Sequence, residues 1–135
     1  MSKQPEWILE AQGVLRQVMA ESYEEEDEEN EVYAILPDAY SDAMWLLRYL
    51  QHYVPMPDII WLLDGGIGFE WRNGQQYIAT MSVYGDGDGE VVYGGKFGEE
   101  RVKGTCTLTE MTTSEHSFVD ALRKENKEES CKAEN

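Results

Sequence analysis

The stretch Asp86-Gly87-Asp88-Gly89-Glu90 has the residue types for metal chemistry. Closely spaced carboxylates bind Ca²⁺, and an EF-hand loop carries oxygen ligands at positions 1, 3 and 5, glycine at 6 and glutamate at 12. Aligning Gly89 with position 6 places Tyr84 at position 1 and Gly95 at position 12. Neither residue offers a carboxylate, and the flanking alternation predicts strands. We interpret the stretch as a hairpin loop and predict no metal or cofactor site.

Acid–base chemistry would need partners that the sequence does not bring together. His52 and His116 are the only histidines, and they lie in different predicted helices. Asp58, Asp64 and Glu70 could supply a carboxylate pair of the kind that glycosidases use, but no sugar-binding or metal signature accompanies them. The sequence therefore predicts a protein that is not an enzyme.

The acidic run over residues 21–31 is the strongest compositional signal. Eight of its eleven residues are acidic and none is basic. Like-charge blocks repel into linkers and also serve as interaction arms, so we predict an acidic linker that helps to bind a partner. The predicted partner-binding residues are Glu24, Glu25, Glu26, Asp27, Glu28, Glu29, Glu31, Glu70, Asp86, Asp88 and Glu90.

Two amphipathic helices are predicted on either side of this run. The first covers residues 5–22, where Pro5 suits the first helical position. The second covers residues 37–53, begins at Pro37 and ends before Pro55. Its apolar stripe consists of Ala39, Ala43, Leu46, Leu47, Leu50 and Tyr53.

Five apolar runs separated by turn signals predict an antiparallel meander. The runs are residues 58–63, 67–72, 75–84, 90–97 and 102–109. Asp-Gly and Asn-Gly pairs between them suit tight hairpin turns. Apolar residues alternate along the runs, which is typical of a sheet with one packed face. We expect the second helix to cover that face.

The predicted fold is α+β, with four to five strands, one long helix packed on a face, and flanking helices at both ends. Residues 1–124 form a single domain that ends in a short helix over residues 115–124. Residues 125–135 are a polar tail that we expect to be disordered. The residues expected on the exposed face of the meander are Glu70, Arg72, Tyr84, Tyr93 and Lys96.

Composition limits the class of partner. The chain of 135 residues has a formal net charge of −16, which opposes direct binding to nucleic acid or to anionic membranes. Without the acidic run, 19 acidic residues still face 11 basic ones, a net of −8. Cys106 and Cys131 are expected to be free thiols, and no apolar run resembles a signal peptide or a membrane span. These features predict a cytoplasmic protein.

The stretch from Leu36 to Gly104 resembles a widespread family of small, largely uncharacterised bacterial and mobile-element proteins. The shared features are an apolar-Pro-x-Pro step, an Asp-Gly-Gly-Ile turn, an acid–Trp pair and a hairpin with Asp-Gly. In this chain they are Val54-Pro55-Met56-Pro57, Asp64-Gly65-Gly66-Ile67, Glu70-Trp71, Asp86 to Gly89, and Val92-Tyr93. The resemblance implies the fold and a bacterial or mobile-element origin, and it assigns no catalytic residue.

The strongly negative net charge, together with the lack of a recognisable combination of catalytic residues, leads to one main hypothesis. We expect a non-enzymatic acidic protein that inhibits or neutralises a basic protein partner, in the manner of phage anti-defence proteins, anti-CRISPR-like inhibitors and DNA mimics. Its target would be a basic surface such as the nucleic-acid-binding groove of a defence or toxin protein. Two alternatives stay open: an antitoxin or immunity protein that binds a toxin through an apolar sheet face, and a small ligand-binding or hydrolytic enzyme.

Overall fold

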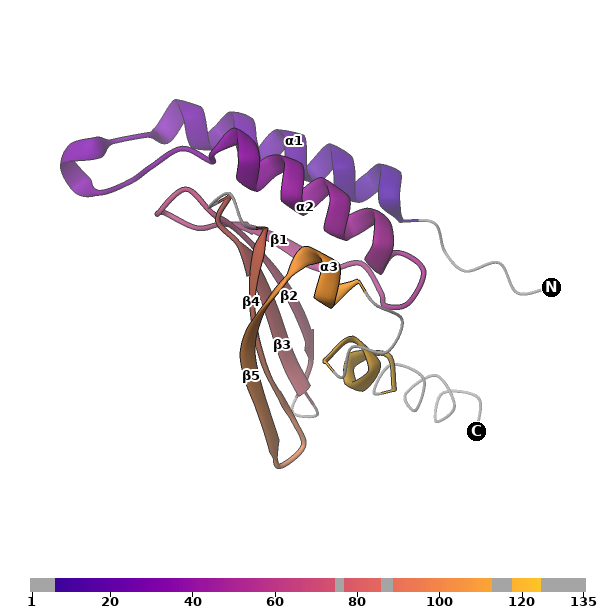
Figure 1. Ribbon diagram of the computed structural model, residues 1–135. Helices are drawn as coiled ribbons and strands as arrows, with labels where there is room; N and C mark the ends of the chain where they lie inside the picture. The colour runs from indigo at the N-terminus through magenta and orange to yellow at the C-terminus, as the bar shows by residue number, and fades with distance from the viewer. Residues whose placement is uncertain (1–6, 75–76, 86–88, 113–117, 125–135) are drawn as a thin grey trace.

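The chain folds as an α+β structure in which two long helices lie over one end of a five-stranded sheet (Figure 1). The computed structural model describes residues 7–74, 77–85, 89–112 and 118–124. Its elements are α1 (Ile8–Glu25), the 3₁₀ turn η1 (Glu28–Asn30), α2 (Pro37–Leu50), β1 (Asp58–Trp61), β2 (Ile67–Asn73), β3 (Tyr77–Val83), β4 (Glu90–Phe97), β5 (Glu100–Thr107) and α3 (Leu108–Met111). Residues 118–124 are also helical. In these ranges no helix is long and apolar enough to cross a membrane.

The sheet is the antiparallel meander that the turn signals predict, with strand order β1-β2-β3-β4-β5. Strand β5 starts at Glu100, two residues earlier than expected, because Gly98 and Glu99 alone form the turn. Gly98 adopts a φ of +63°, a left-handed conformation that glycine tolerates best. The strand ends at Thr107, whose side chain caps α3.

The helix boundaries differ from the predicted ones by a few residues. Helix α2 begins at Pro37 as expected but ends at Leu50, and residues 51–53 form turns instead of a further helical turn. Helix α1 continues to Glu25, three residues beyond its predicted end and into the acidic run. Its predicted start at Pro5, the polar tail and residues 115–117 of the last predicted helix lie outside the described residues.

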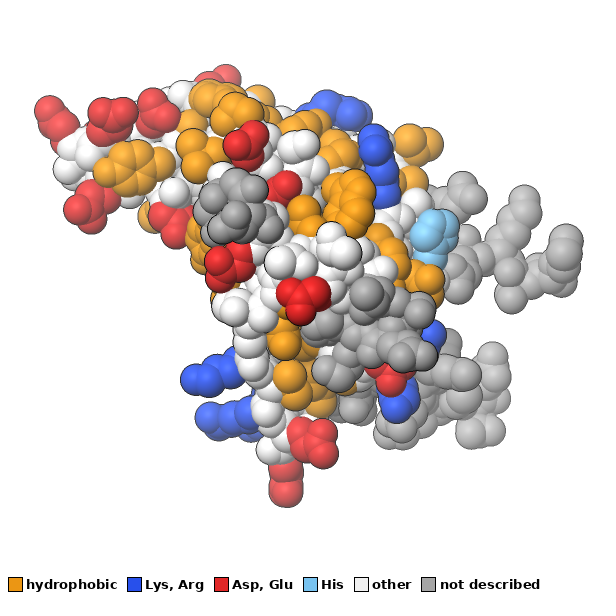
Figure 2. Space-filling view, viewed as in Figure 1, with side chains coloured by type: hydrophobic (Ala, Val, Ile, Leu, Met, Phe, Trp, Pro, Cys, Tyr) orange, Lys and Arg blue, Asp and Glu red, His pale blue; other side chains and the backbone are white. Residues whose placement is uncertain are grey.

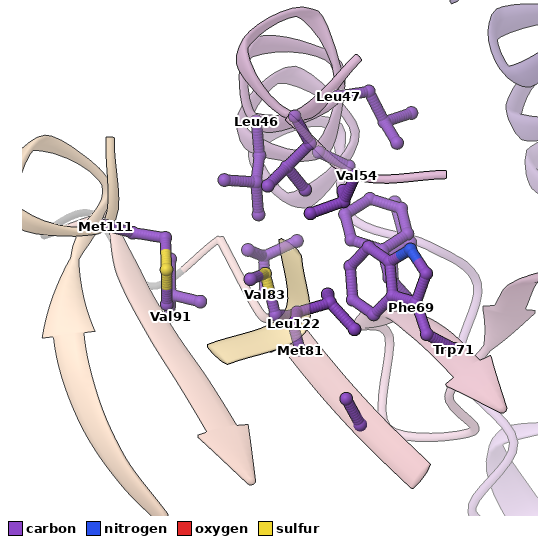
Figure 3. Packing of buried hydrophobic residues seen from close by; sticks show 14 of the residues in the cluster. Leu46, Leu47, Val54, Phe69, Trp71, Met81, Val83, Val91, Met111 and Leu122 are labelled. Carbon is purple, nitrogen blue, oxygen red and sulfur yellow. The ribbon is translucent and has the colours of Figure 1, made fainter. Parts of the chain in front are cut away.

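The buried core lies between the helices and one face of the sheet, which we call the inner face (Figure 3). Leu46, Leu47 and Leu50 of α2 are fully buried, which confirms that this helix covers the sheet. The helical residues 118–124 cover the inner face further along the strands and bury Phe118 and Leu122. The inner-face residues of β2, β3 and β4 that are buried are Ile67, Phe69, Trp71, Tyr77, Ala79, Met81, Val83, Val91 and Phe97.

Tyr93 was expected on the exposed face, and this prediction is wrong. Alternation along β4 turns Tyr93 to the same side as the buried Val91 and Phe97. Its ring centroid lies 5.0 Å from that of Phe118, and its hydroxyl end lies over Gly104, where a side chain would collide with it. Tyr93 therefore belongs to the core side of the sheet.

Two tryptophan indoles, one at the start of α1 and one in β2, donate to the connection between α2 and β1. Trp7 Nε1 donates to the carbonyl oxygen of Val54 at 3.0 Å, and Trp71 Nε1 donates to that of Pro55 at 2.7 Å. Both bonds hold the segment that joins α2 to β1. Because a buried donor without a partner costs about 1–3 kcal/mol, these bonds also fix the path of that segment.

Candidate functional site

The acidic run forms a projection at one end of the molecule, where α1 passes into α2 (Figures 1 and 2). We call this projection the acidic tip. All its carboxylate-bearing residues are exposed, and red side chains cover it in Figure 2. Besides Glu21, they are the seven predicted partner-binding residues of the run, Glu24, Glu25, Glu26, Asp27, Glu28, Glu29 and Glu31.

The acidic tip has regular local structure, so the prediction of a linker over residues 21–31 needs correction. Glu21 to Glu25 complete the last turn of α1, and η1 follows. Asp27 and Val32 form a two-way antiparallel bridge, with N–O distances of 2.8 and 2.9 Å. Glu31 turns the chain with a φ of +58°, a conformation that costs a non-glycine residue about 1–2 kcal/mol. Backbone hydrogen bonds thus offset the charge repulsion that favours an extended chain.

Side-chain hydrogen bonds anchor the base of the tip. Ser22 is fully buried, donates to the carbonyl oxygen of Met19 at 2.7 Å and accepts from the Ile35 amide at 3.0 Å. Glu26 Oε2 accepts from the Ala34 amide at 3.2 Å. These bonds join the end of α1 to the strand-like segment before α2, so the base presents the carboxylates in a defined arrangement.

The carboxylates of the acidic tip form none of the ion pairs recorded in the described part of the chain. The ion pairs recorded there join Arg72 to Glu70, and Arg123 and Lys124 to Asp120, and none involves the tip. Like charges a helical turn apart destabilise a helix by a few tenths of a kcal/mol per pair. The tip therefore generates a local negative potential that a positive surface would relieve.

An apolar surface adjoins the tip, and we call it the apolar shoulder. It consists of Tyr33, Leu36 and Leu63, which are 42%, 47% and 55% exposed. These residues are neighbours because the Tyr33 amide donates to the Leu63 carbonyl oxygen at 2.8 Å and the Leu36 amide donates to that of Gly65 at 3.1 Å. Aromatic and aliphatic side chains beside charges are typical of protein–protein interfaces.

The second exposed surface is the outer face of the sheet, opposite the core. Strand pairing aligns Arg72, Ile78, Lys96 and Arg101 in one row across β2, β3, β4 and β5. We use the name basic row for these four residues, of which Ile78 is the one apolar member, together with Lys103, which lies in the neighbouring row of the same face. Lys96 and Arg101 are directly opposite each other, an arrangement that is unfavourable for like charges.

Sequence reasoning placed Arg72 and Lys96 on this face but missed Arg101 and Lys103. Their signal is the two-residue turn at Gly98 and Glu99, which pairs Phe97 with Glu100 and therefore places Arg101 opposite Lys96 and Lys103 opposite Gly94. The expected loop over residues 98–101 concealed that register. The outer face thus carries positive charge near Gly74 and Gly98, although the chain as a whole has a strongly negative net charge.

The remaining predicted partner-binding residues do not join the tip. Glu70 lies on the outer face, and its carboxylate is 2.8 Å from the Arg72 guanidinium. Glu90 is half-buried at the start of β4, opposite Thr107. Asp86 and Asp88 lie outside the described residues.

The carboxylates considered for acid–base chemistry are only partly brought together. Asp58 and Glu70 are directly opposite each other across β1 and β2. Asp64 lies instead in the following turn, where its Oδ1 accepts from the Gly66 amide at 3.3 Å. Among the residues that the structure describes, no cluster of three His, Cys, Asp or Glu side chains could hold a metal ion.

The cysteine and histidine candidates are also separated. Burial, reinforced by the charge of Glu110, raises the pKa of the Cys106 thiol to about 11, so the thiol is protonated at neutral pH. His52 is exposed beside the Tyr53 ring, while His116 and Cys131 fall outside the described part of the chain. A thiol that is protonated at neutral pH lacks the thiolate that nucleophilic chemistry needs.

Comparison with known proteins finds no matching protein-family model, no matching curated protein and no matching solved structure. The resemblance based on the Asp-Gly-Gly-Ile turn and the acid–Trp pair therefore stays a prediction.

Proposed function

We propose that this chain is a non-enzymatic binding protein whose acidic tip engages a basic surface of another protein and blocks it. The observation that carries the proposal is the tip itself: seven exposed carboxylates on a hydrogen-bonded projection, with no basic side chain among them. A pre-ordered charged surface loses little conformational entropy on binding.

The basic partner that we propose is a nucleic-acid-handling protein, such as a defence or toxin protein. Grooves that bind nucleic acid carry arginine and lysine side chains for phosphates. A row of carboxylates is attracted to the same side chains, and the steering would raise the association rate at low salt. In this role the protein acts as a DNA mimic, in the manner of phage anti-defence inhibitors.

The apolar shoulder supports a role in specificity. Charge alone attracts many basic proteins, whereas Tyr33, Leu36 and Leu63 offer surface that must fit one partner. Burying exposed apolar surface contributes about 25 cal/mol per Å² and is not weakened by salt. We therefore assign the carboxylates to attraction and orientation, and the shoulder to retention of the partner.

A capture experiment with matched variants tests the proposal. The tip variant carries Glu24→Gln, Glu25→Gln, Glu28→Gln and Glu29→Gln, which removes four charges and leaves the side-chain bond of Glu26 in place. The control variant removes four exposed charges elsewhere, through Glu10→Gln, Asp58→Asn, Glu99→Gln and Glu100→Gln. Each tagged protein is exposed to bacterial lysate at about 50 mM and about 500 mM salt, between which screening of exposed charges changes strongly.

The expected result is a basic partner that wild type and the control variant capture at low salt and that the tip variant captures at least tenfold less. Equal capture by both variants would show that the tip is not the binding surface.

A second candidate, the antitoxin or immunity protein, is favoured by one observation. The outer face of the sheet exposes three aliphatic side chains, Ile60, Ile78 and Val92. A toxin bound there would stay bound at about 500 mM salt and would be captured equally by the tip variant.

A further inference from the structure

We propose that two copies of this chain form a symmetric dimer in which the acidic tip of each copy binds the basic row on the outer sheet face of the other. The proposal goes beyond the binding of a foreign partner, although both use the acidic tip. The proposal rests on charge complementarity between two surfaces of this chain, since the strongly acidic protein gathers basic side chains on the outer face of its sheet.

The basic row is a shaped surface as well as a charged one. Gly94 leaves a gap among the side chains of the outer face, and a hollow of about 500 Å³ lies there. Its floor includes Ile78, Thr80 and Gly94, and its rim includes Lys96, Arg101 and Lys103. An apolar floor with a cationic rim suits a glutamate side chain, whose methylene groups and carboxylate match the two parts.

The rim cations are available to an external carboxylate. Arg72 already pairs with Glu70, but the described structure records no ion pair for Lys96, Arg101 or Lys103. The direct opposition of Lys96 and Arg101 is unfavourable by itself, and an anion between them would remove that repulsion.

The tip cannot reach the basic row of its own molecule. Gly85, which follows β3, lies against Asp38 and Ala39 of α2, so that end of the sheet lies beside the helices and the tip. The basic row lies near the opposite end, beside the turn at Gly98, and the five residue steps from Ile67 to Arg72 span about 17 Å. Only a second copy can bring tip and row together.

The positions of the two surfaces allow a closed dimer. In Figure 1 residues 118–124 lie on one side of the sheet, and the acidic tip projects beyond the other side. Basic side chains project from the lower part of the sheet on that same side in Figure 2. A two-fold rotation about an axis parallel to the sheet and across the strands would therefore form both tip–row contacts at once, which closes the assembly at two copies.

The net charge of −16 does not prevent this contact at moderate salt. At about 0.15 M salt the Debye length is about 8 Å, so charges far from the interface are screened while the contacting ones still attract. Near 0.01 M salt the screening length grows to about 30 Å and the copies repel as whole molecules. Dimerisation should therefore be strongest at intermediate salt.

Analytical ultracentrifugation of the purified full chain at about 0.15 M salt tests the proposal. The row variant, Lys96→Glu with Arg101→Glu, keeps a like-charged cross-strand pair, so its cost to the fold resembles that of the wild type. Arg16→Glu with Arg48→Glu is the control, because it changes the net charge equally at exposed sites on the helices. Far-ultraviolet circular dichroism checks that each variant folds.

We expect wild type and control to dimerise, and the row variant and the fourfold tip variant each to raise the dimer dissociation constant at least tenfold. A wild type that stays monomeric, or a row variant or tip variant that dimerises normally, would overturn the proposal. A monomeric wild type that still captures a basic partner would leave the proposed function intact.

Discussion

At the scale of single residues, Ser22 determines how the acidic tip leaves α1. Its hydroxyl donates to Met19 and accepts from Ile35, so one buried oxygen joins the end of the helix to the segment that leads into α2. Both ends of the acidic projection are thereby held at one point. The carboxylates beyond that point can then repel one another without separating the two segments.

Ser22→Ala should destabilise the fold by about 1–3 kcal/mol, because the Ile35 amide would stay buried without its acceptor. Urea unfolding of the purified chain measures the change. The control is Ser41→Ala, at an exposed position of α2, which should change the free energy of unfolding by less than about 0.5 kcal/mol. Equal values for both variants would mean that Ser22 does not hold the base of the tip.

At the scale of elements, the contact between the β3–β4 turn and α2 sets the position of the helices over the sheet. Gly85 has a φ of +66°, and a Cβ atom placed there would collide with the Ala39 amide nitrogen. The start of α2 therefore contacts the backbone of Gly85 directly. Such an approach is possible only where no side chain intervenes.

Gly85→Ala should displace α2 and lower the free energy of unfolding by more than Gly74→Ala. Both glycines have positive φ, so both substitutions cost about 1–2 kcal/mol of backbone strain. Only Gly85 adds a collision, since nothing lies within 4 Å of a Cβ atom at Gly74. Thermal unfolding of the two variants compares them, and similar midpoints would contradict the close contact between this turn and α2.

The elements themselves were largely predictable, because their signals are local. Pro37 begins the second helix, and Asn73-Gly74 and Gly98 mark turns that the structure confirms. The end of β5 was missed because Leu108 and Thr109 continue an apolar alternation. The capping box between Thr107 and Glu110 starts a helix there instead.

At the scale of the whole molecule, charge is separated between two surfaces. The acidic tip lies at the helical end, and the basic row lies on the outer face near the far hairpins. Concentrating charge in this way costs stability, since like charges lie close together on both surfaces. A cost of this kind is typical of surfaces kept for binding.

The fourfold tip variant should therefore be more stable than wild type, by about 1 kcal/mol at low salt, because it removes several like-charge contacts. The gain should shrink at about 1 M salt, where the Debye length is about 3 Å. Urea unfolding at the two salt concentrations measures it, with the fourfold control variant beside it. A tip variant with a lower free energy of unfolding than wild type would show that the carboxylates stabilise the fold. The interpretation that the acidic tip lowers stability and is kept for binding would then be wrong.

The sequence by itself determined the α+β class, the meander and the acidic character of one segment, because periodicity, turn residues and charge are properties of neighbouring positions. Only the tertiary structure decided which side chains share a surface. Arg72, Lys96 and Arg101 form a row because three hairpin registers align them, and a shift of one residue in any register would move a side chain to the core side. The ordered tip likewise depends on Ser22 meeting Ile35, a contact between segments that local charge repulsion alone would keep apart.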